Sequence, residues 1–355
     1  MASANVAGMS ELLNRQWRVA GYPAPEEIPG AAQFQWCEEP APEPGPDEFL
    51  VKTICLAPGP AQRGYLLPGS SRLFPPVELG QVMRGRGVGR IVRSRHPDYA
   101  EDEIFVGSLG WQDYSVQRPR GAEFVFSTSR IDQPAEPLSL ELGMLGQAGA
   151  TAYFGLTEAA AIQPGDAVLV SAAAGGVGSM AGQLARLMGA RQVVGLAGGP
   201  EKCAWLVDEL GYHAAIDYRR DDLDEQLEEA FPDGIDVFFD NVGGEILNTA
   251  LNHLALRARV AICGFIATNY LEDPKCGPIN YRRLVEKRAR MQGFIVFDFW
   301  EQFPAAREKL LAWYKAGKLR HCQDEEQGLE NMPHCLASLF TGANRGIKLC
   351  RVAPD

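Results

Sequence analysis

The chain has 355 residues, a net charge of −11, 46% hydrophobic residues and 22% charged residues. The negative charge argues against a nucleic-acid partner, and no apolar stretch approaches transmembrane length, so we expect no membrane partner. The length is sufficient for two domains. Residues 1–14 lack a basic region followed by an apolar core, and the eight cysteines form no C-x-x-C pair. These features predict a cytoplasmic protein with reduced thiols.

The region before about residue 140 predicts a compact β-rich domain. It is rich in Pro and Gly, and short strand-like segments lie at 49–54, 87–93 and 113–116. Residues 40–46 are typical of a surface loop between strands. A further strand is predicted at 347–352. Its return to the β-rich domain would make that domain discontinuous and leave a substrate cleft between two domains.

The segment 168–189 predicts a buried strand, a glycine turn and an amphipathic helix in that order. It carries the pattern G-x-G-x-x-G with Ala173 in place of the first glycine, while Gly175 and Gly178 fill the other two places. A strand that enters a helix through glycines presents backbone N–H groups at the helix N-terminus, where they and the helix dipole favour a pyrophosphate. The segment therefore predicts a dinucleotide site.

Alternating strands and helices follow this turn along the chain. Further strands are predicted at 193–196, 214–216, 235–239, 260–263 and 294–297, with helices at 201–210 and 221–230. This alternation is typical of a doubly wound parallel sheet, which binds its ligand at the carboxyl ends of the strands.

The end of the second strand of this series predicts the type of cofactor. An NAD site usually has an Asp or Glu there, which accepts a hydrogen bond from the ribose 2′-hydroxyl. Here the sequence is Ala197-Gly198-Gly199, with no carboxylate to repel a 2′-phosphate. Lys202 on the next helix, and Tyr218 and Arg219 after the third strand, are available to bind such a phosphate. We therefore expect NADPH as the cofactor.

The assembled pattern resembles the medium-chain dehydrogenase/reductase superfamily. Within it, the chain is similar to the zinc-independent enone reductases, the group of prostaglandin reductase, leukotriene B4 12-hydroxydehydrogenase and curcumin reductase. The resemblance extends from about residue 14 to residue 352. It is carried by the segments PPVELGQVMRGRGVGRIVRSRHPDYA, GWQDYSV, GATAYFGL, VSAAAGGVGSMAGQLA, FFDNVGG, RLVEKRARMQGFIVFD and GANRGIK.

The resemblance implies an α/β fold in which a Rossmann domain, a doubly wound parallel sheet, is inserted into a GroES-like β-rich catalytic domain. We expect the GroES-like domain at 1–140 plus 315–355 and the Rossmann NADP-binding domain at 141–314. The resemblance also implies the residues that contact the cofactor. These are Thr151, Gly175, Gly176, Val177, Gly178, Lys202, Tyr218, Asn241, Phe294, Val296 and Asn344.

No metal site is expected in the chain. The zinc-dependent branch of the superfamily uses Cys, His and an acid, and zinc needs three or four convergent ligands. The five histidines form no motif, and Cys55 has no downstream His-Glu partner. Cys55 is therefore predicted to be a core residue.

The chain departs from the group in two segments on the expected substrate side. The S-x-D-P-Y-x-R-like loop of the family is here 56–64, where the acid and the aromatic are absent and Arg63 remains. The I-S-x-Y-N segment usually supplies a Tyr near the substrate carbonyl. Here Asn269 falls at the Tyr position and Tyr270 follows one residue later. Both are candidate catalytic residues, although Tyr270 is equally compatible with a surface position.

The sequence thus predicts reduction of the α,β carbon–carbon double bond of a small enone or enal by hydride transfer from NADPH. Three alternatives remain: quinone reduction, a specialised biosynthetic reductase or cyclase acting on an unsaturated intermediate, and a non-catalytic NADPH-binding partner protein. A homodimer is also expected, because the group pairs edge strands and the apolar segment 292–297 is suited to such pairing.

Overall fold

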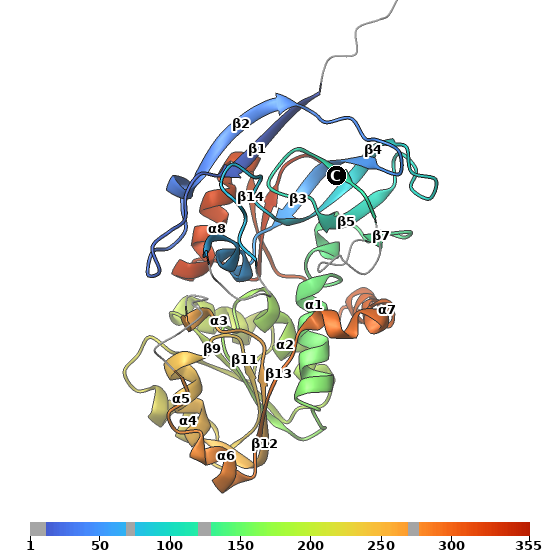
Figure 1. Cartoon of the computed structure of the whole chain (residues 1–355). Coiled ribbons are helices and arrows are strands. Elements are labelled where there is room, and N and C mark those ends of the chain that lie inside the picture. Colours follow the sequence, from blue (N-terminus) through green and yellow to red (C-terminus); the bar gives the residue numbers. More distant parts are fainter. Residues whose placement is uncertain (1–11, 69–74, 120–128, 269–276) are drawn as a thin grey trace, which may run out of the picture.

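The computed structural model describes residues 12–68, 75–119, 129–268 and 277–355. Its elements form two bodies, one above the other in Figure 1. The upper body, here the β-rich domain, contains both ends of the described chain. The lower body, here the α/β domain, is built from the middle of the chain. In the described part of the chain, no helix is both long enough and apolar enough to cross a membrane.

A six-stranded sheet in which all strands are parallel forms the centre of the α/β domain. Its strand order is β10-β9-β8-β11-β12-β13, the order of a doubly wound dinucleotide-binding sheet. The strands are β8 (Ala167–Val170), β9 (Gln192–Ala197), β10 (Ala214–Asp217), β11 (Ile235–Asp240), β12 (Leu254–Ile262) and β13 (Arg290–Gly293). The doubly wound sheet predicted from the sequence is confirmed.

Helices cover both faces of this sheet, and the alternation of strand side chains explains why. Along β8, Val168 and Val170 belong to one core cluster and Ala167 and Leu169 to another. The first cluster packs under α1, α2, α3 and α7, and the second packs under α4, α5 and α6 (Figure 1). The helices are α1 (Gln147–Phe154), α2 (Gly176–Leu187), α3 (Pro200–Asp208), α4 (Leu223–Ala230), α5 (Gly244–Asn252), α6 (Arg282–Lys287) and α7 (Phe303–Lys315).

The sixth strand differs from the sequence-based prediction, which was wrong at 294–297. The strand is β13 (Arg290–Gly293), and residues Val296–Gln302 form a 3₁₀ helix. Val296 packs with Ala150, Phe154 and Ala306 in a small core between α1 and α7. Residues 294–297 are therefore apolar because helices cover them. The edge strand β13 is exposed, so its sequence lacks the apolar run that predicts a buried strand.

The β-rich domain contains a two-stranded and a seven-stranded sheet. Strand β15 pairs antiparallel with β3, so the C-terminal strand does return to the N-terminal domain. The predicted bounds of the two domains, 1–140 plus 315–355 and 141–314, stay a prediction. The elements are β1 (Leu13–Val19), β2 (Phe34–Pro40), β3 (Phe49–Ala57), β4 (Arg86–Ser94), β5 (Ile104–Ser108), β6 (Tyr114–Gln117), β7 (Ser129–Arg130), β14 (Gln323–Gln327), α8 (Met332–Thr341) and β15 (Ile347–Arg351).

Candidate functional site

The glycine turn lies between β8 and α2 and leaves a helix N-terminus open. Helix α2 begins at Gly176, and Gly175 before it provides no side-chain cap. A Cβ added at Gly178 would lie 2.2 Å from the carbonyl oxygen of Ala172, so only glycine allows the helix to pack this tightly on the turn. The backbone N–H groups of the first turn of α2, at Gly176, Val177 and Gly178, are thus placed to bind an anion.

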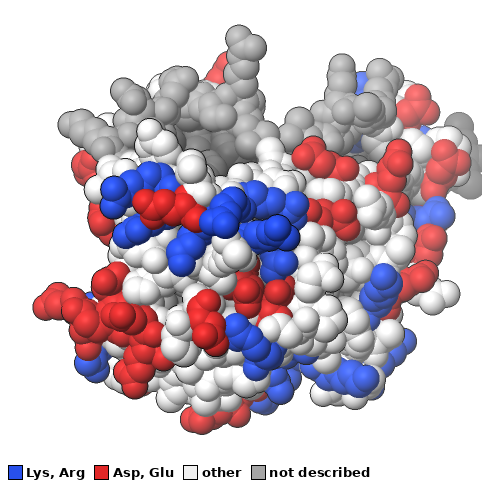
Figure 2. All heavy atoms as spheres, turned by 90° about the horizontal axis from the view of Figure 1, so that it is seen from below, with Lys and Arg blue, Asp and Glu red and all other residues white. Residues whose placement is uncertain are grey.

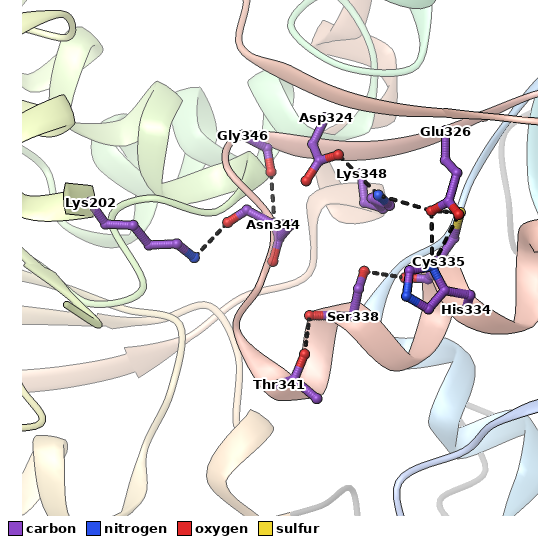
Figure 3. Close-up of polar contacts among 10 residues, drawn as sticks. All are labelled: Lys202, Asp324, Glu326, His334, Cys335, Ser338, Thr341, Asn344, Gly346 and Lys348. Atoms are coloured by element: carbon purple, nitrogen blue, oxygen red, sulfur yellow. Dashed lines mark hydrogen bonds and ion pairs between the residues drawn. The ribbon is translucent and has the colours of Figure 1, made fainter.

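A loop from the β-rich domain, residues 342–346, lies against this turn. Gly346 forms a bridge with Gly175 and donates its N–H to the carbonyl of Ala174 at 2.8 Å. Within the loop, the Asn344 side-chain amide donates to the carbonyl of Gly346 at 2.9 Å (Figure 3). The structure therefore brings the predicted residue Asn344 to the glycine turn, although 166 or more residues separate them in sequence.

The loop is fixed at its far end by a buried lysine at the start of β15. Lys348 forms ion pairs with Asp324 at 2.9 Å and with Glu326 at 3.2 Å, both on β14. Glu326 also accepts a hydrogen bond from the thiol of Cys335 on α8. Figure 3 shows this group beside the loop, to its right. These contacts hold the two elements that flank 342–346, and hence the loop itself, in one position.

Lys202 on α3 joins the two domains. Its ammonium group donates to the carbonyl oxygens of Gly342 at 2.7 Å and Asn344 at 2.6 Å. Partial burial lowers the pKa of Lys202 below its ordinary value, and the nearby guanidinium groups of Arg219 and Arg345 lower it further. Lys202, Arg219 and Arg345, here the cation cluster, therefore gather positive charge in one place.

Gly198, which directly follows β9, leaves room for this cluster because glycine has no side chain. A Cβ added at Gly198 would lie 2.8 Å from Nε of Arg219 and 3.0 Å from the Tyr218 hydroxyl. A neighbouring acid, Asp217 at the end of β10, is engaged by the backbone, since its Oδ1 accepts hydrogen bonds from the N–H groups of Gly199 and Arg219. The absence of a carboxylate at the end of β9 thus coincides with three cations and a phenol.

A buried carboxylate organises the point at which β8 and β11 end side by side. Asp240 accepts a hydrogen bond from the Ser171 hydroxyl at 2.7 Å and others from the N–H groups of Val242 and Gly243. Burial raises the pKa of Asp240. The Asn241 side chain donates to the carbonyl of Ser171 at 2.7 Å. The predicted residue Asn241 is therefore held at the carboxyl ends of these two strands.

The residues predicted to lie near the nicotinamide are dispersed around α1. Thr151 is a partly buried residue of α1. The Phe294 ring meets the Phe239 ring edge-on, with 6.2 Å between centroids. Val296 is buried in the core between α1 and α7. Direct contact of these three side chains with a ligand stays a prediction.

Arg63, predicted to face the substrate, is buried within the β-rich domain. Its guanidinium donates to the backbone carbonyls of Pro25 and Glu27 and lies over the Phe340 ring. Burial lowers its pKa. These contacts attach the 25–27 segment to the 3₁₀ helix Pro60–Leu66, and a contact with substrate stays a prediction.

Cys55, expected as a core residue, is fully buried in β3, and burial raises its pKa to about 12. A thiol with that pKa is protonated at neutral pH. Within the described ranges, no three His, Cys, Asp or Glu side chains converge on a point that would hold a metal ion.

The two candidate catalytic residues, Asn269 and Tyr270, lie outside the described residues. The chain before them is fixed at the ligand end of the sheet. Ala267 donates its N–H to the carbonyl of Val242 at 3.0 Å, and Gly264 donates to that of Asp240. The described chain therefore reaches Thr268 beside the turn that carries Asn241.

Four residues of this site were not predicted from the sequence: Ser171, Asp217, Asp240 and Arg345. Each of them makes a contact with a residue distant in sequence, and the sequence alone does not reveal such a contact. Only the position of Asp217 and Asp240 at strand ends gave a signal. Together the site has three features. The N-terminus of α2 is open, the turn before it has no room for a Cβ at Gly178, and the cation cluster lies beside the end of β9, where the chain has no carboxylate. This donor set fits a dinucleotide that carries a 2′-phosphate.

Comparison with known proteins agrees with this geometry. Residues 176–312 match the family model described as zinc-binding dehydrogenase, and residues 15–125 match the N-terminal domain of oxidoreductase. The chain is 36% identical to the NADPH-dependent curcumin reductase of Escherichia coli (strain K12) over 98% of its length and 99% of the relative's. It is 38% identical to prostaglandin reductase 1 of Bos taurus over 85% of its own length and 93% of the relative's.

A solved structure is similar over the whole fold. The crystal structure of CurA in complex with NADPH from Vibrio vulnificus superposes with a TM-score of 0.87 at 33% identity, covering 96% of this chain and 100% of the other. Both the sequence relatives and this structure extend over the two domains. The chain therefore belongs to the zinc-independent medium-chain dehydrogenase/reductase family, in the group that contains the curcumin and prostaglandin reductases.

Proposed function

We propose that this chain is an NADPH-dependent oxidoreductase that reduces the α,β carbon–carbon double bond of an enone or enal. The observation that carries the choice of cofactor is the cation cluster beside the acid-free end of β9. The substrate class is supported by the relatives, which are named as reductases of curcumin and of prostaglandins. The substrate is a small molecule, and the cleft between the two domains is the proposed place for it.

The chain's own residues hold and orient the reactants in this proposal. The first turn of α2 binds the pyrophosphate, the cation cluster and Tyr218 bind the 2′-phosphate end, and Asn241 and Asn344 bracket the middle of the cofactor. When bound, the reduced nicotinamide supplies a hydride to the β-carbon of the substrate. Negative charge then develops on the substrate carbonyl oxygen, where a hydrogen-bond donor lowers the barrier. Tyr270 is the proposed donor, Asn269 is the alternative, and water protonates the α-carbon.

A turnover assay tests this function. We would follow the absorbance of the reduced nicotinamide with an enal, a cyclic enone, a long-chain enone and a quinone, with NADH in parallel, and would analyse the products. Enone turnover with NADPH preferred supports the proposal. Turnover of the quinone alone would support quinone reduction instead. A product other than the saturated ketone would indicate a biosynthetic reductase or cyclase, and tight NADPH binding without turnover of any substrate would indicate a non-catalytic partner protein.

Replacement of Lys202 tests the cofactor preference. We expect Lys202→Met to weaken NADPH binding roughly tenfold to hundredfold, because charge-assisted hydrogen bonds to a phosphate are lost, and to leave NADH binding within about twofold. Lys202→Arg retains the charge and should restore most of the affinity. Equal losses for both cofactors, measured by fluorescence titration, would mean that Lys202 only joins α3 to residues 342–346.

The lowered pKa of Lys202 gives this preference a pH dependence. Burial and the neighbouring arginines favour the neutral amine, so the free protein loses the ammonium charge at a lower pH than an ordinary lysine. We therefore expect the Kd for NADPH to be constant near neutral pH and to rise in the alkaline range, before a free lysine would titrate. In Lys202→Arg this rise should vanish. An unchanged profile in that variant would contradict the assignment.

A homodimer is proposed on the exposed edge of the α/β sheet. All four residues of edge strand β13 are exposed, and the segment before it in the chain carries exposed large apolar side chains: Ile279 is 86%, Tyr281 65% and Val285 78% exposed. An unpaired strand edge favours pairing with another strand, and exposed apolar side chains favour burial in an interface. We expect two copies to pair through β13. Light scattering should give twice the mass of one chain, and Gln292→Pro, which removes a ladder donor, should give a monomer. A wild-type mass of one chain would refute the dimer.

A further inference from the structure

One ion pair crosses from the α/β domain to the β-rich domain within the cation cluster. Arg345, in the loop 342–346, donates from Nη2 to Oε2 of Glu201 at 2.8 Å. Glu201 is in the first turn of α3, next to Lys202. The Arg345 side chain is 45% exposed and that of Glu201 is 85% exposed. Water therefore reaches both groups, and the contact between them is free to exchange partners.

The other two cations of the cluster form no ion pair in the described part of the chain, although the charge of Asp324 acts on Lys202. Lys202 donates to backbone carbonyls. Arg219 lies between Gly198 and Gly342, where its guanidinium reaches both domains without forming an ion pair. Of the ion pairs in the described residues, only that of Arg345 with Glu201 brings a carboxylate to the cluster. Glu201 is thus the carboxylate that forms an ion pair with the cluster, whereas the nearby Asp217 accepts hydrogen bonds from the backbone N–H groups of Gly199 and Arg219.

A phosphate is a stronger partner than this carboxylate. It carries nearly two negative charges and three acceptor oxygens, and guanidinium groups bind phosphate oxygens in a bidentate manner. Glu201 cannot leave α3, so when a phosphate is present its charge remains nearby and repels it. Arg345 therefore attracts a phosphate, whereas Glu201 repels it.

We propose that Arg345 is a specificity-determining residue for the 2′-phosphate of NADPH, and that Glu201 is a built-in competitor for it. In the free protein Arg345 is held by Glu201, and on binding it changes partner to the phosphate. Because Arg345 belongs to the β-rich domain, this exchange connects that domain to the adenine end of the cofactor. The inference rests on the proposed use of NADPH and is independent of the proposed enone substrate.

The proposal predicts opposite effects for the two members of one ion pair. Arg345→Met should weaken NADPH binding roughly tenfold, since one charge-assisted phosphate contact is lost. Glu201→Gln should strengthen NADPH binding by about two- to fivefold, because it removes a like charge and releases the arginine. NADH, which has no 2′-phosphate, should bind within about twofold of wild type in both variants. In the double variant the gain from Glu201→Gln should shrink, because its arginine partner is gone.

The experiment is a titration of the full chain with NADPH and with NADH at low salt, followed by tryptophan fluorescence, for wild type, the two single variants and the double variant. The matched controls are Arg283→Met and Glu286→Gln, which break a similar exposed ion pair of 2.7 Å on α6. Helix α6 lies at the lower end of the α/β domain, away from α3 (Figure 1). Figure 2 shows that end from below, where Lys and Arg side chains also gather. If the two control variants leave NADPH binding unchanged, the effect of Arg345→Met does not arise from a general loss of positive charge on the protein.

Two results would overturn the proposal. One is an equal loss of NADPH and NADH binding in Arg345→Met, which indicates a structural role for the pair. The other is unchanged or weaker NADPH binding in Glu201→Gln, which means that no competition exists. Wild-type protein that binds NADPH no better than NADH would overturn the cofactor assignment as well. Failure of every enone in the turnover assay would leave these binding results intact, so the two proposals fail separately.

Discussion

Gly178→Ala is expected to abolish dinucleotide binding, with a loss of more than about a hundredfold in affinity, and to destabilise the fold. The new Cβ would lie 2.2 Å from the carbonyl oxygen of Ala172 and 2.7 Å from the Cα of Ala173. Both atoms belong to the backbone, so no side-chain rotation relieves the contact. The start of α2 must instead move away from the turn that places its N–H groups. Overpacking of this kind typically costs about 1–3 kcal/mol.

Fluorescence titration with NADPH and thermal unfolding measure the two parts of this effect. Gly21→Ala is the matched control, because a Cβ at Gly21 meets nothing within 4 Å, and it should leave both quantities unchanged. If Gly178→Ala binds NADPH like the wild type, the phosphates do not lie on the first turn of α2. If stability falls while affinity holds, Gly178 serves packing alone.

Tyr270→Phe is expected to lower kcat by roughly a hundredfold to a thousandfold on the best enone, the usual effect of removing one donor from a developing oxyanion. The chain enters this segment at a defined place, since Ala267 is bonded to Val242 and Thr268 Oγ1 donates to the carbonyl of Phe265 at 2.7 Å. The NADPH dissociation constant should not change, because the phenol acts on the substrate and not on the cofactor.

Asn269→Ala is the neighbouring control and should change kcat little. The reverse pattern, with loss in Asn269→Ala and none in Tyr270→Phe, would make Asn269 the donor. Asn269→Tyr separates two further interpretations. A gain of simple enone reduction in that variant would indicate that the natural chain performs a different reaction, whereas no effect would favour Tyr270 as the group already acting.

The parallel sheet could be predicted from the sequence because its strands are buried on both faces. Ala167, Val168, Leu169 and Val170 are all fully buried, so the strand has the continuous apolar run that marks such elements. The same criterion failed at the sheet edge. Strand β13 has one neighbour and exposed side chains, so its polar sequence gives no signal, while the apolar residues after it pack between α1 and α7.

The amino-acid sequence alone determined the family, the glycine turn and the acid-free end of β9, because these depend on backbone space and on residues close together in the chain. Only the tertiary structure placed Arg345 and Asn344 of the C-terminal loop beside Lys202, and Asp240 beside Ser171. It also placed Arg63 against the 25–27 backbone. Such contacts join residues far apart in sequence, and their charges and hydrogen bonds acquire a meaning only when the fold brings them within a few ångströms.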